Sequence, residues 1–339
     1  MSDNALLQSG AELAGYRIER FVARGGMGAV YEATQLSLDR RVALKFISPE
    51  LGADERFRER FRREARSGAA IEHPNILPVY ETDELPDGSL FLALRFVDGP
   101  DLSSLLRERG PLEAREAVAI LAQVGNALDA AHERGVIHRD VKPANVLLEA
   151  REQGWHAYLS DFGLAKPDEE VGEHTRPGET LGTVDYMAPE QINGEPLDRR
   201  VDVYSFGCMV YRCLTDAPPY KRETRTATLM AHVNAPVPVP SEAIADLPTP
   251  LDVVVARAME KDPAKRARSA GALMRWAAAQ LQLDPDGAAP TSEEEWAAIG
   301  APPPDATKRP RRRLLRASLL SAAVYSPIWV ATYLLGRSL

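Results

Sequence analysis

The chain has 339 residues, of which 45% are hydrophobic and 27% charged, a composition that supports a sizeable core and excludes a disordered protein. Its two cysteines, Cys208 and Cys213, form no CxxC pair and stand near no histidine cluster, which excludes a disulfide framework and a zinc site and favours a reducing compartment. The formal charge of -8 is unevenly distributed along the chain. The residues after Asp305 are basic, because they contribute seven basic groups and no acid. The rest of the chain is strongly acidic, which excludes general nucleic-acid binding.

The first part of the chain predicts a mostly antiparallel sheet with one helix. Residues 1–15 form an N-terminal extension without the basic start and long apolar run of a signal peptide. Five short runs after it have the composition of strands, at 16–23, 28–34, 41–47, 76–82 and 90–96. A helical stretch near residues 54–71 interrupts them. We expect residues 16–97 to form a β-rich lobe.

The second part, residues 98–283, has the apolar period of helices. Before Gly135, apolar residues recur at three- and four-residue intervals, at Val118, Leu121, Val124, Leu128 and Ala131. Residues 236–250 form a proline-rich loop, after which helix resumes at Leu251. We expect a helical second lobe, so that residues 16–283 make one two-lobed α+β domain.

The last part has the composition of a linker followed by a membrane span. Residues 284–312 are rich in Pro, Ala, Gly and charge, which is typical of flexible linkers. Within residues 313–339, the uncharged run 317–336 would be about 30 Å long as a helix, the thickness of a bilayer core. Basic residues gather on its N-terminal side, which predicts a single-pass helix with the preceding domain in the cytoplasm. The alternatives are a basic tail on the membrane surface and a segment packed on the protein.

A glycine-rich turn joins the first two expected strands. From Ala23 to Val30 the sequence reads ARGGMGAV, and glycines there let backbone N–H groups approach a phosphate chain. By itself the pattern is equally consistent with a hairpin that binds nothing.

Lys45 lies in an apolar strand run, where an unpaired ammonium would be costly to bury. On the following helix Phe57, Phe61 and Glu64 share one face, so the Glu64 carboxylate can be the anionic partner of Lys45. The alternative is a lysine that reaches solvent and a solvated glutamate.

Three further motifs follow in chain order. Residues 138–145 read HRDVKPAN, residues 161–163 read DFG, and residues 188–190 read APE. With the glycine-rich turn, Lys45 and Glu64, they match the protein-kinase signature in order and spacing.

From about Tyr16 to Leu283 the chain resembles protein kinases, and the runs GGMGAVYEA, HRDVKPANVLL and GTVDYMAPEQ are most similar to bacterial Hanks-type serine/threonine kinases. The resemblance implies a two-lobed kinase fold that binds ATP and two Mg²⁺ ions, or Mn²⁺, between the lobes. Lys142 after the HRD motif and Thr183 before the APE motif imply Ser or Thr acceptors on protein substrates.

The resemblance also implies a role for each motif residue. Lys45, held by Glu64, would bind the α- and β-phosphates, and Asp161 and Asn145 would hold the metal ions. Asp140 would accept the proton of the acceptor hydroxyl, and Lys142 would lie against the γ-phosphate. Further nucleotide contacts would come from the glycine-rich loop, the adenine pocket and the hinge, namely Val22, Ala23, Arg24, Gly25, Gly26, Met27, Gly28, Ala29, Val30, Ala43, Leu147, Arg95 and Val97, with Leu94 as gatekeeper.

Two positions depart from the family pattern. Ala23 replaces the first glycine of the loop, and Arg95 stands in the hinge where relatives often have an acid. Ala adds only a methyl group and Arg95 would act through its backbone, so we expect nucleotide binding to persist. The alternative function is a pseudokinase that binds nucleotide as a signalling scaffold. Asp202 and Arg266 match structural positions of the family, Arg266 as the ion-pair partner of Glu190.

The polar stretch between the DFG and APE motifs predicts regulation by phosphorylation. Phosphate there would add negative charge that Arg139, beside Asp140, can pair with. We expect autophosphorylation at Thr175 or Thr180, in trans within a homodimer, with Thr183 reserved for substrate contact. The alternative is a loop that needs no modification.

Overall fold

The computed structural model describes residues 7–25, 28–162 and 184–283. Several expectations fall outside the described residues, namely those on Gly26, Met27, Thr175, Thr180, Thr183, the linker 284–312 and the membrane segment 313–339. Among the described helices, none combines the length and apolar character needed to cross a bilayer.

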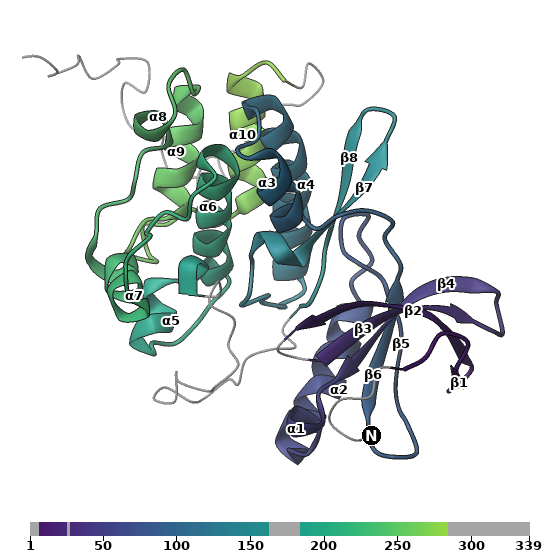
Figure 1. The fold of residues 1–339 in the computed structure, drawn as a ribbon. Helices are drawn as coiled ribbons and strands as arrows, with labels where there is room; N and C mark the ends of the chain where they lie inside the picture. The colour runs from purple at the N-terminus through teal and green to yellow at the C-terminus, as the bar shows by residue number, and fades with distance from the viewer. Residues whose placement is uncertain (1–6, 26–27, 163–183, 284–339) are drawn as a thin grey trace, which may run out of the picture. The chain divides into compact units, whose positions relative to one another are not determined.

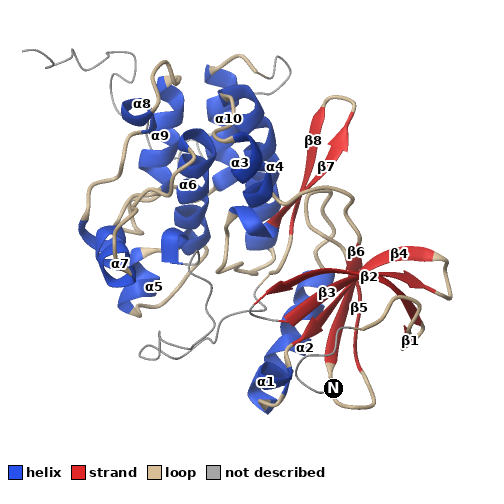
Figure 2. Ribbon diagram, in the orientation of Figure 1, coloured by secondary structure: helices blue, strands red, loops and turns tan. Residues whose placement is uncertain are grey.

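A six-stranded antiparallel sheet forms the first lobe (Figures 1 and 2). In spatial order its strands are β1 (Glu12–Leu13), β2 (Tyr16–Gly25), β3 (Gly28–Gln35), β4 (Arg40–Ile47), β6 (Leu90–Arg95) and β5 (Val79–Glu84). Strands form here because β-branched and aromatic residues fit a pleated, half-buried surface. The five runs expected from the sequence correspond to β2 to β6 and are confirmed.

Two helices accompany the sheet, α1 (Pro49–Gly52) and α2 (Glu55–Ala69). α2 begins after Asp54, whose carboxylate accepts the Arg56 N–H and so satisfies a donor that the first turn leaves open. Its buried stripe is Phe57, Phe61 and Ala65, at a spacing of four residues. The sequence predicts one helix here; the additional short α1 forms because a serine caps it and a proline occupies its first position.

The second lobe is helical, as expected (Figure 2). Its helices are α3 (Leu102–Arg109), α4 (Ala114–Glu133), α5 (Pro189–Asn193), α6 (Arg200–Thr215), α7 (Arg225–Asn234), α8 (Pro240–Ala243), α9 (Thr249–Ala258) and α10 (Ala270–Gln280). The expected apolar stripe before Gly135 is the buried face of α4. The short α8 lies within the stretch expected to be loop, and α9 begins slightly before Leu251.

α6 lies at the centre of the second-lobe core. Both cysteines of the chain, Cys208 and Cys213, are fully buried on this helix. Burial raises the pKa of both thiols, that of Cys213 to about 12. Neither sulfur is therefore a thiolate at neutral pH.

A β-hairpin that the sequence does not predict lies at the edge of the second lobe, beside α4 (Figure 1). β7 (Val146–Arg151) and β8 (Gly154–Leu159) pair antiparallel, directly after Asn145 and just before Asp161. The Ser160 N–H closes the hairpin by donating to the Asn145 carbonyl at 2.9 Å. The hairpin therefore fixes the separation of the two residues expected to bind metal.

A buried polar cluster joins α6 and α7 to the segment after α9. Lys261 Nζ donates to the hydroxyls of Tyr204 and Tyr220, at 3.1 and 2.9 Å, and to the carbonyl of His232 at 2.6 Å. Burial lowers the pKa of His232 to about 3, with a further contribution from the Lys261 charge. The imidazole is therefore held neutral at physiological pH.

Acidification is expected to destabilise the domain through His232. The unfolded chain binds a proton at this side chain near pH 6.5, whereas the folded chain does so only near pH 3, so the unfolded state binds more protons between these values. Stability that is complete above pH 6.5 is lost as the pH falls, by about 2 to 3 kcal/mol at roughly pH 4.5. Urea unfolding at neutral and acidic pH measures this loss, which should be smaller by that amount in His232→Asn. An equal loss in both proteins would contradict the assignment.

Candidate active site

Asp202 on α6 holds the loop that carries Asp140. Its carboxylate is 1% exposed and accepts the backbone N–H groups of His138 at 2.8 Å and Arg139 at 2.7 Å. It also lies 2.7 Å from His132 Nε2. Arg139 has a φ of 64°, which costs a non-glycine residue free energy, and the buried carboxylate stabilises that conformation. The loop is thus anchored to the core of the second lobe.

Lys142 and Asn145 both contact one oxygen of Asp140. Lys142 Nζ lies 2.7 Å and Asn145 Nδ2 lies 3.2 Å from Oδ2. Asn145 Nδ2 also donates to the Asp140 carbonyl at 2.8 Å. Because both side chains contact Oδ2, Oδ1 is the oxygen that can accept a proton from an incoming hydroxyl. Because the amide nitrogen of Asn145 is committed to Asp140, its amide oxygen is the group that can bind a cation.

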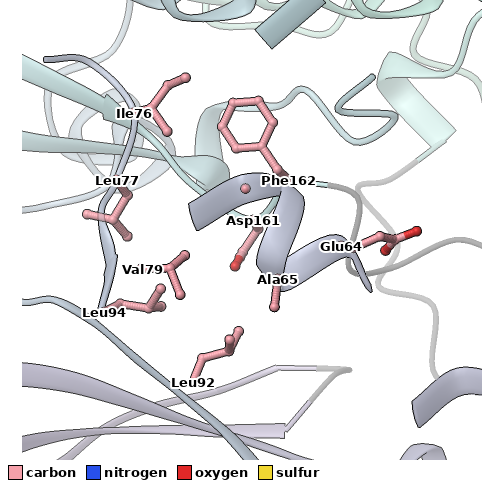
Figure 3. Close-up of a pocket in the computed structure, with 10 residues that line it drawn as sticks. Glu64, Ala65, Ile76, Leu77, Val79, Leu92, Leu94, Asp161 and Phe162 are labelled. Carbon is pink, nitrogen blue, oxygen red and sulfur yellow. The ribbon is translucent and has the colours of Figure 1, made fainter. Parts of the chain in front are cut away.

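Lys45 forms an ion pair with Asp161. Its Nζ lies 2.6 Å from Asp161 Oδ1, and the Lys45 side chain is only 11% exposed. An anionic partner was expected, but the structure differs in which acid supplies it, since Figure 3 shows the Glu64 carboxylate directed away from Asp161. The reason lies in α2, whose buried stripe runs through Ala65 and leaves residue 64 at the edge of that stripe.

Asp161 is an ionised carboxylate. Burial alone would raise the pKa of this carboxyl, but the charge of Lys45 and its hydrogen bond, aided by His138 and Lys142, hold the pKa below its ordinary value. A charged oxygen donor of this kind suits a hard divalent cation.

A small cavity lies between α2 and Phe162 (Figure 3). Its volume of about 20 Å³ is room for a single water molecule. The cavity exists because the inner face of α2 ends in the small residues Ala65 and Gly68, and a Cβ built on Gly68 would meet no atom within 4 Å. Leu94, the expected gatekeeper, is buried and lines the same cavity.

The residues expected to contact adenine gather at one place. Ala43 on β4 lies opposite Leu94 on β6. Ala43 and Leu147, on β7, pack against one apolar cluster that includes Leu94 and Val97. Strands from both lobes therefore meet where the nucleotide base was expected to bind.

The glycine-rich hairpin is formed by β2 and β3. In its described part, three residue pairs face each other across the hairpin, namely Ala23 and Val30, Arg24 and Ala29, and Gly25 and Gly28. Val22 precedes them and is 42% exposed. On the other side of β3, Val30 lies opposite Lys45, which brings the hairpin beside the Lys45–Asp161 pair.

Arg95 contacts two residues, Glu149 and Tyr158, for which the sequence predicts no role. Arg95 Nη2 lies 3.5 Å from both carboxylate oxygens of Glu149, and the Tyr158 hydroxyl donates to Glu149 at 3.3 Å. Neither partner lies in a motif. The one signal in the sequence was the cation in the hinge, which implies a partner without identifying it.

The expected ion pair of Glu190 and Arg266 is confirmed. Arg266 Nη1 and Nη2 lie 2.5 and 2.9 Å from the two carboxylate oxygens of Glu190. The side chains are 0% and 4% exposed, respectively. This bidentate pair fastens the start of α5 to the segment after α9.

Comparison with known proteins identifies the family to which the chain is similar. Residues 16–276 match the family model of the protein kinase domain. The serine/threonine-protein kinase PknE of Mycobacterium tuberculosis is 42% identical over 283 residues, which cover 83% of this chain and 49% of PknE. PknH of the same organism is 41% identical over 288 residues, which cover 84% of this chain and 45% of PknH. The chain thus spans about half the length of these curated relatives.

Solved structures agree with the sequence match. The crystal structure of the Mycobacterium tuberculosis PknI kinase domain is 34% identical, with a TM-score of 0.66, and the match covers 82% of this chain and all of that one. The β-rich lobe, the helical lobe and the motif residues described above together form a two-lobed kinase fold. The chain belongs to the protein kinase family.

Proposed function

We propose that the chain is an ATP-dependent protein kinase that transfers the γ-phosphoryl group to serine or threonine hydroxyls of proteins. The observation that carries the proposal is the joint placement of Asp140, Lys142 and Asn145 on one anchored loop. Phosphoryl transfer needs in-line positioning and neutralisation of charge more than covalent chemistry, and these side chains provide both. The named function of the relatives supports the same activity.

The residues present fit a nucleotide and divalent cations. Asp161 offers a charged carboxylate and Asn145 an amide oxygen, the hard donors that Mg²⁺ prefers, with Mn²⁺ a second choice. Two protein ligands are typical of Mg²⁺ sites whose other ligands are phosphates and water. Bound MgATP would supply the transferable phosphoryl group.

The chain's own residues then act in defined ways. Asp140 Oδ1 orients the acceptor hydroxyl and accepts its proton. Lys142, which already contacts Asp140, neutralises charge beside the transferred group. Lys45 leaves Asp161 to bind phosphate oxygens, and we propose that Glu64 takes over as its partner in that state.

The protein is proposed to be regulated by its own phosphorylation. Thr175 and Thr180 are the candidate sites, modified in trans within a homodimer, and Arg139 is the group that would pair with the added phosphate. Mass spectrometry of protein incubated with ATP tests this, because full activity without modification of either threonine would overturn it.

Membrane attachment is proposed for the C-terminal part. Residues 284–312 would link the kinase domain to one membrane helix within 313–339, with the domain in the cytoplasm. Carbonate extraction of membranes separates the possibilities, since a spanning chain stays in the pellet and a peripheral tail is released.

The kinase activity itself is tested with radiolabelled ATP, a divalent cation and a generic basic protein. Transfer to serine and threonine supports the proposal, and phosphoamino-acid analysis identifies the acceptor. Nucleotide binding without turnover under all cation conditions would instead favour the pseudokinase alternative.

A further inference from the structure

The hinge segment, residues 95–101, is held against β7 by its backbone. The Leu148 N–H donates to the Pro100 carbonyl at 2.9 Å. At Gly99 the two chains approach so closely that an added Cβ would lie 2.0 Å from the Leu148 carbonyl oxygen, which only glycine permits. β7 also carries Leu147 and directly follows Asn145. The position of the hinge relative to β7 therefore sets the position of adenine contacts relative to a metal-binding residue.

A second attachment is made by the side chain of Arg95, where β6 ends. Its Nη2 lies 3.5 Å from both oxygens of Glu149 on β7. Its guanidinium carbon lies 5.0 Å from the ring centroid of Tyr158 on β8, within the range of a cation–π contact. The Tyr158 hydroxyl donates to the same Glu149 at 3.3 Å. We call these three side chains the hinge tie.

Charge and burial favour the hinge tie over an incidental surface contact. The Arg95 and Glu149 side chains are 37% and 21% exposed, and Tyr158 is 4% exposed. Glu149 also accepts a hydrogen bond from Arg151, so donors from the hinge, β7 and β8 converge on one carboxylate. The N-terminal end of the hinge segment is also attached to the first lobe, because the Arg95 N–H donates to the Pro78 carbonyl at 3.0 Å.

We propose that Arg95 is a positioning residue for nucleotide binding, acting through Glu149 and Tyr158 to hold the hinge backbone on β7. The inference rests on the proposed kinase function and adds a chain-specific role for the cation at this position. The guanidinium need not touch the nucleotide. It limits the freedom of the backbone groups of Arg95 and Val97 that would contact adenine.

A double-mutant cycle in the full chain tests the hinge tie, with Arg95→Met, Glu149→Gln and both together. We expect each single variant to raise the KM for ATP about three- to tenfold, the range for a partly exposed ion pair plus a cation–π contact, with kcat within about twofold of wild type. The double variant should be no worse than the worse single one. Arg95→Lys should recover most of the loss, because it keeps a cation over the Tyr158 ring.

The chain contains a matched control away from the hinge. Arg109 Nη1 lies 3.5 Å from Glu116, its guanidinium carbon lies 5.6 Å from the Trp155 ring centroid, and Trp155 donates to Glu116 at 3.0 Å. Arg109→Met and Glu116→Gln remove the same chemistry and should leave the KM for ATP unchanged. Additive losses in the cycle, or an equal rise of KM in the control variants, would overturn the proposal.

Hydrogen exchange without nucleotide separates this inference from the proposed function. Amides of residues 96–99 and of Asp101 should exchange about three- to tenfold faster in Glu149→Gln than in wild type or Glu116→Gln, since loss of the ion pair frees the hinge backbone. Unchanged exchange would refute the hinge tie even if the protein is a kinase. Faster exchange in a protein that transfers no phosphate would refute the kinase function and leave the hinge tie standing.

Discussion

Asp140→Asn is expected to lower kcat for phosphoryl transfer by about 10²- to 10⁴-fold while changing nucleotide affinity less than about twofold. Lys142 and Asn145 both donate toward Oδ2 of Asp140. An asparagine would turn its single amide oxygen toward these donors and present its NH₂ group to the acceptor hydroxyl, where it cannot accept a proton. Steady-state transfer from radiolabelled ATP measures kcat, and calorimetry with a non-hydrolysable analogue measures affinity.

Asp198→Asn is the matched control for this variant. Asp198 is also a carboxylate paired with a cation, Arg200, but its side chain is 49% exposed and it lies outside the catalytic loop. Its replacement should leave kcat within about twofold of wild type. Transfer by Asp140→Asn within tenfold of the wild-type rate would remove Asp140 from the proposed role.

Glu190→Leu is expected to destabilise the domain by about 3 to 5 kcal/mol. The Arg266 side chain is 0% exposed, so the variant leaves a buried guanidinium without its counter-ion. Two of its N–H groups would still reach the carbonyls of Glu260 and Arg200, at 2.9 and 2.8 Å, which neutralise no charge. Equilibrium unfolding in urea gives the free-energy difference.

The double variant Glu190→Leu with Arg266→Met tests the cause of that loss. Removing both charges should restore part of the stability lost in the single variant, because the cost lies in the uncompensated charge. The exposed pair of Asp198 and Arg200 serves for comparison, and Asp198→Asn should cost less than about 1 kcal/mol. A double variant as unstable as the sum of its singles would show that the two side chains act independently.

Strand positions in the first lobe are predictable from sequence because runs rich in apolar, β-branched and aromatic residues are separated by stretches of turn residues. The β7–β8 hairpin is not, although Val146 and Leu159 are fully buried. Glu149 in β7 and Gly154 in β8 are of residue types that are depleted in strands, so tertiary packing and not local pattern determines the hairpin. The extra helices α1 and α8 were not expected because four residues are too few to show the apolar period of a helix.

The chemical identity of the site residues is predictable from motif spacing, but their pairing is not. The apolar run around Lys45 implies an acidic partner, since burial of an ammonium is costly. The sequence favoured Glu64, whereas the structure pairs Lys45 with Asp161, because the partner depends on the rotation of α2 against the sheet. The partner of Arg95 could not be predicted from the sequence either, since Glu149 is 54 residues away and lies on a strand that was not predicted.

The buried cysteines of α6 have a practical consequence for labelling. Cys208 and Cys213 are the only sulfhydryls in the chain, both are 0% exposed, and burial raises the pKa of each. A maleimide reacts with exposed thiolates, so the folded domain offers it no target. A cysteine introduced at Leu38 in the first lobe, 65% exposed, and another at Met230 in the second, 49% exposed, would therefore carry a fluorophore pair selectively. Lobe movement on nucleotide binding can thus be followed by energy transfer while both native cysteines stay in place.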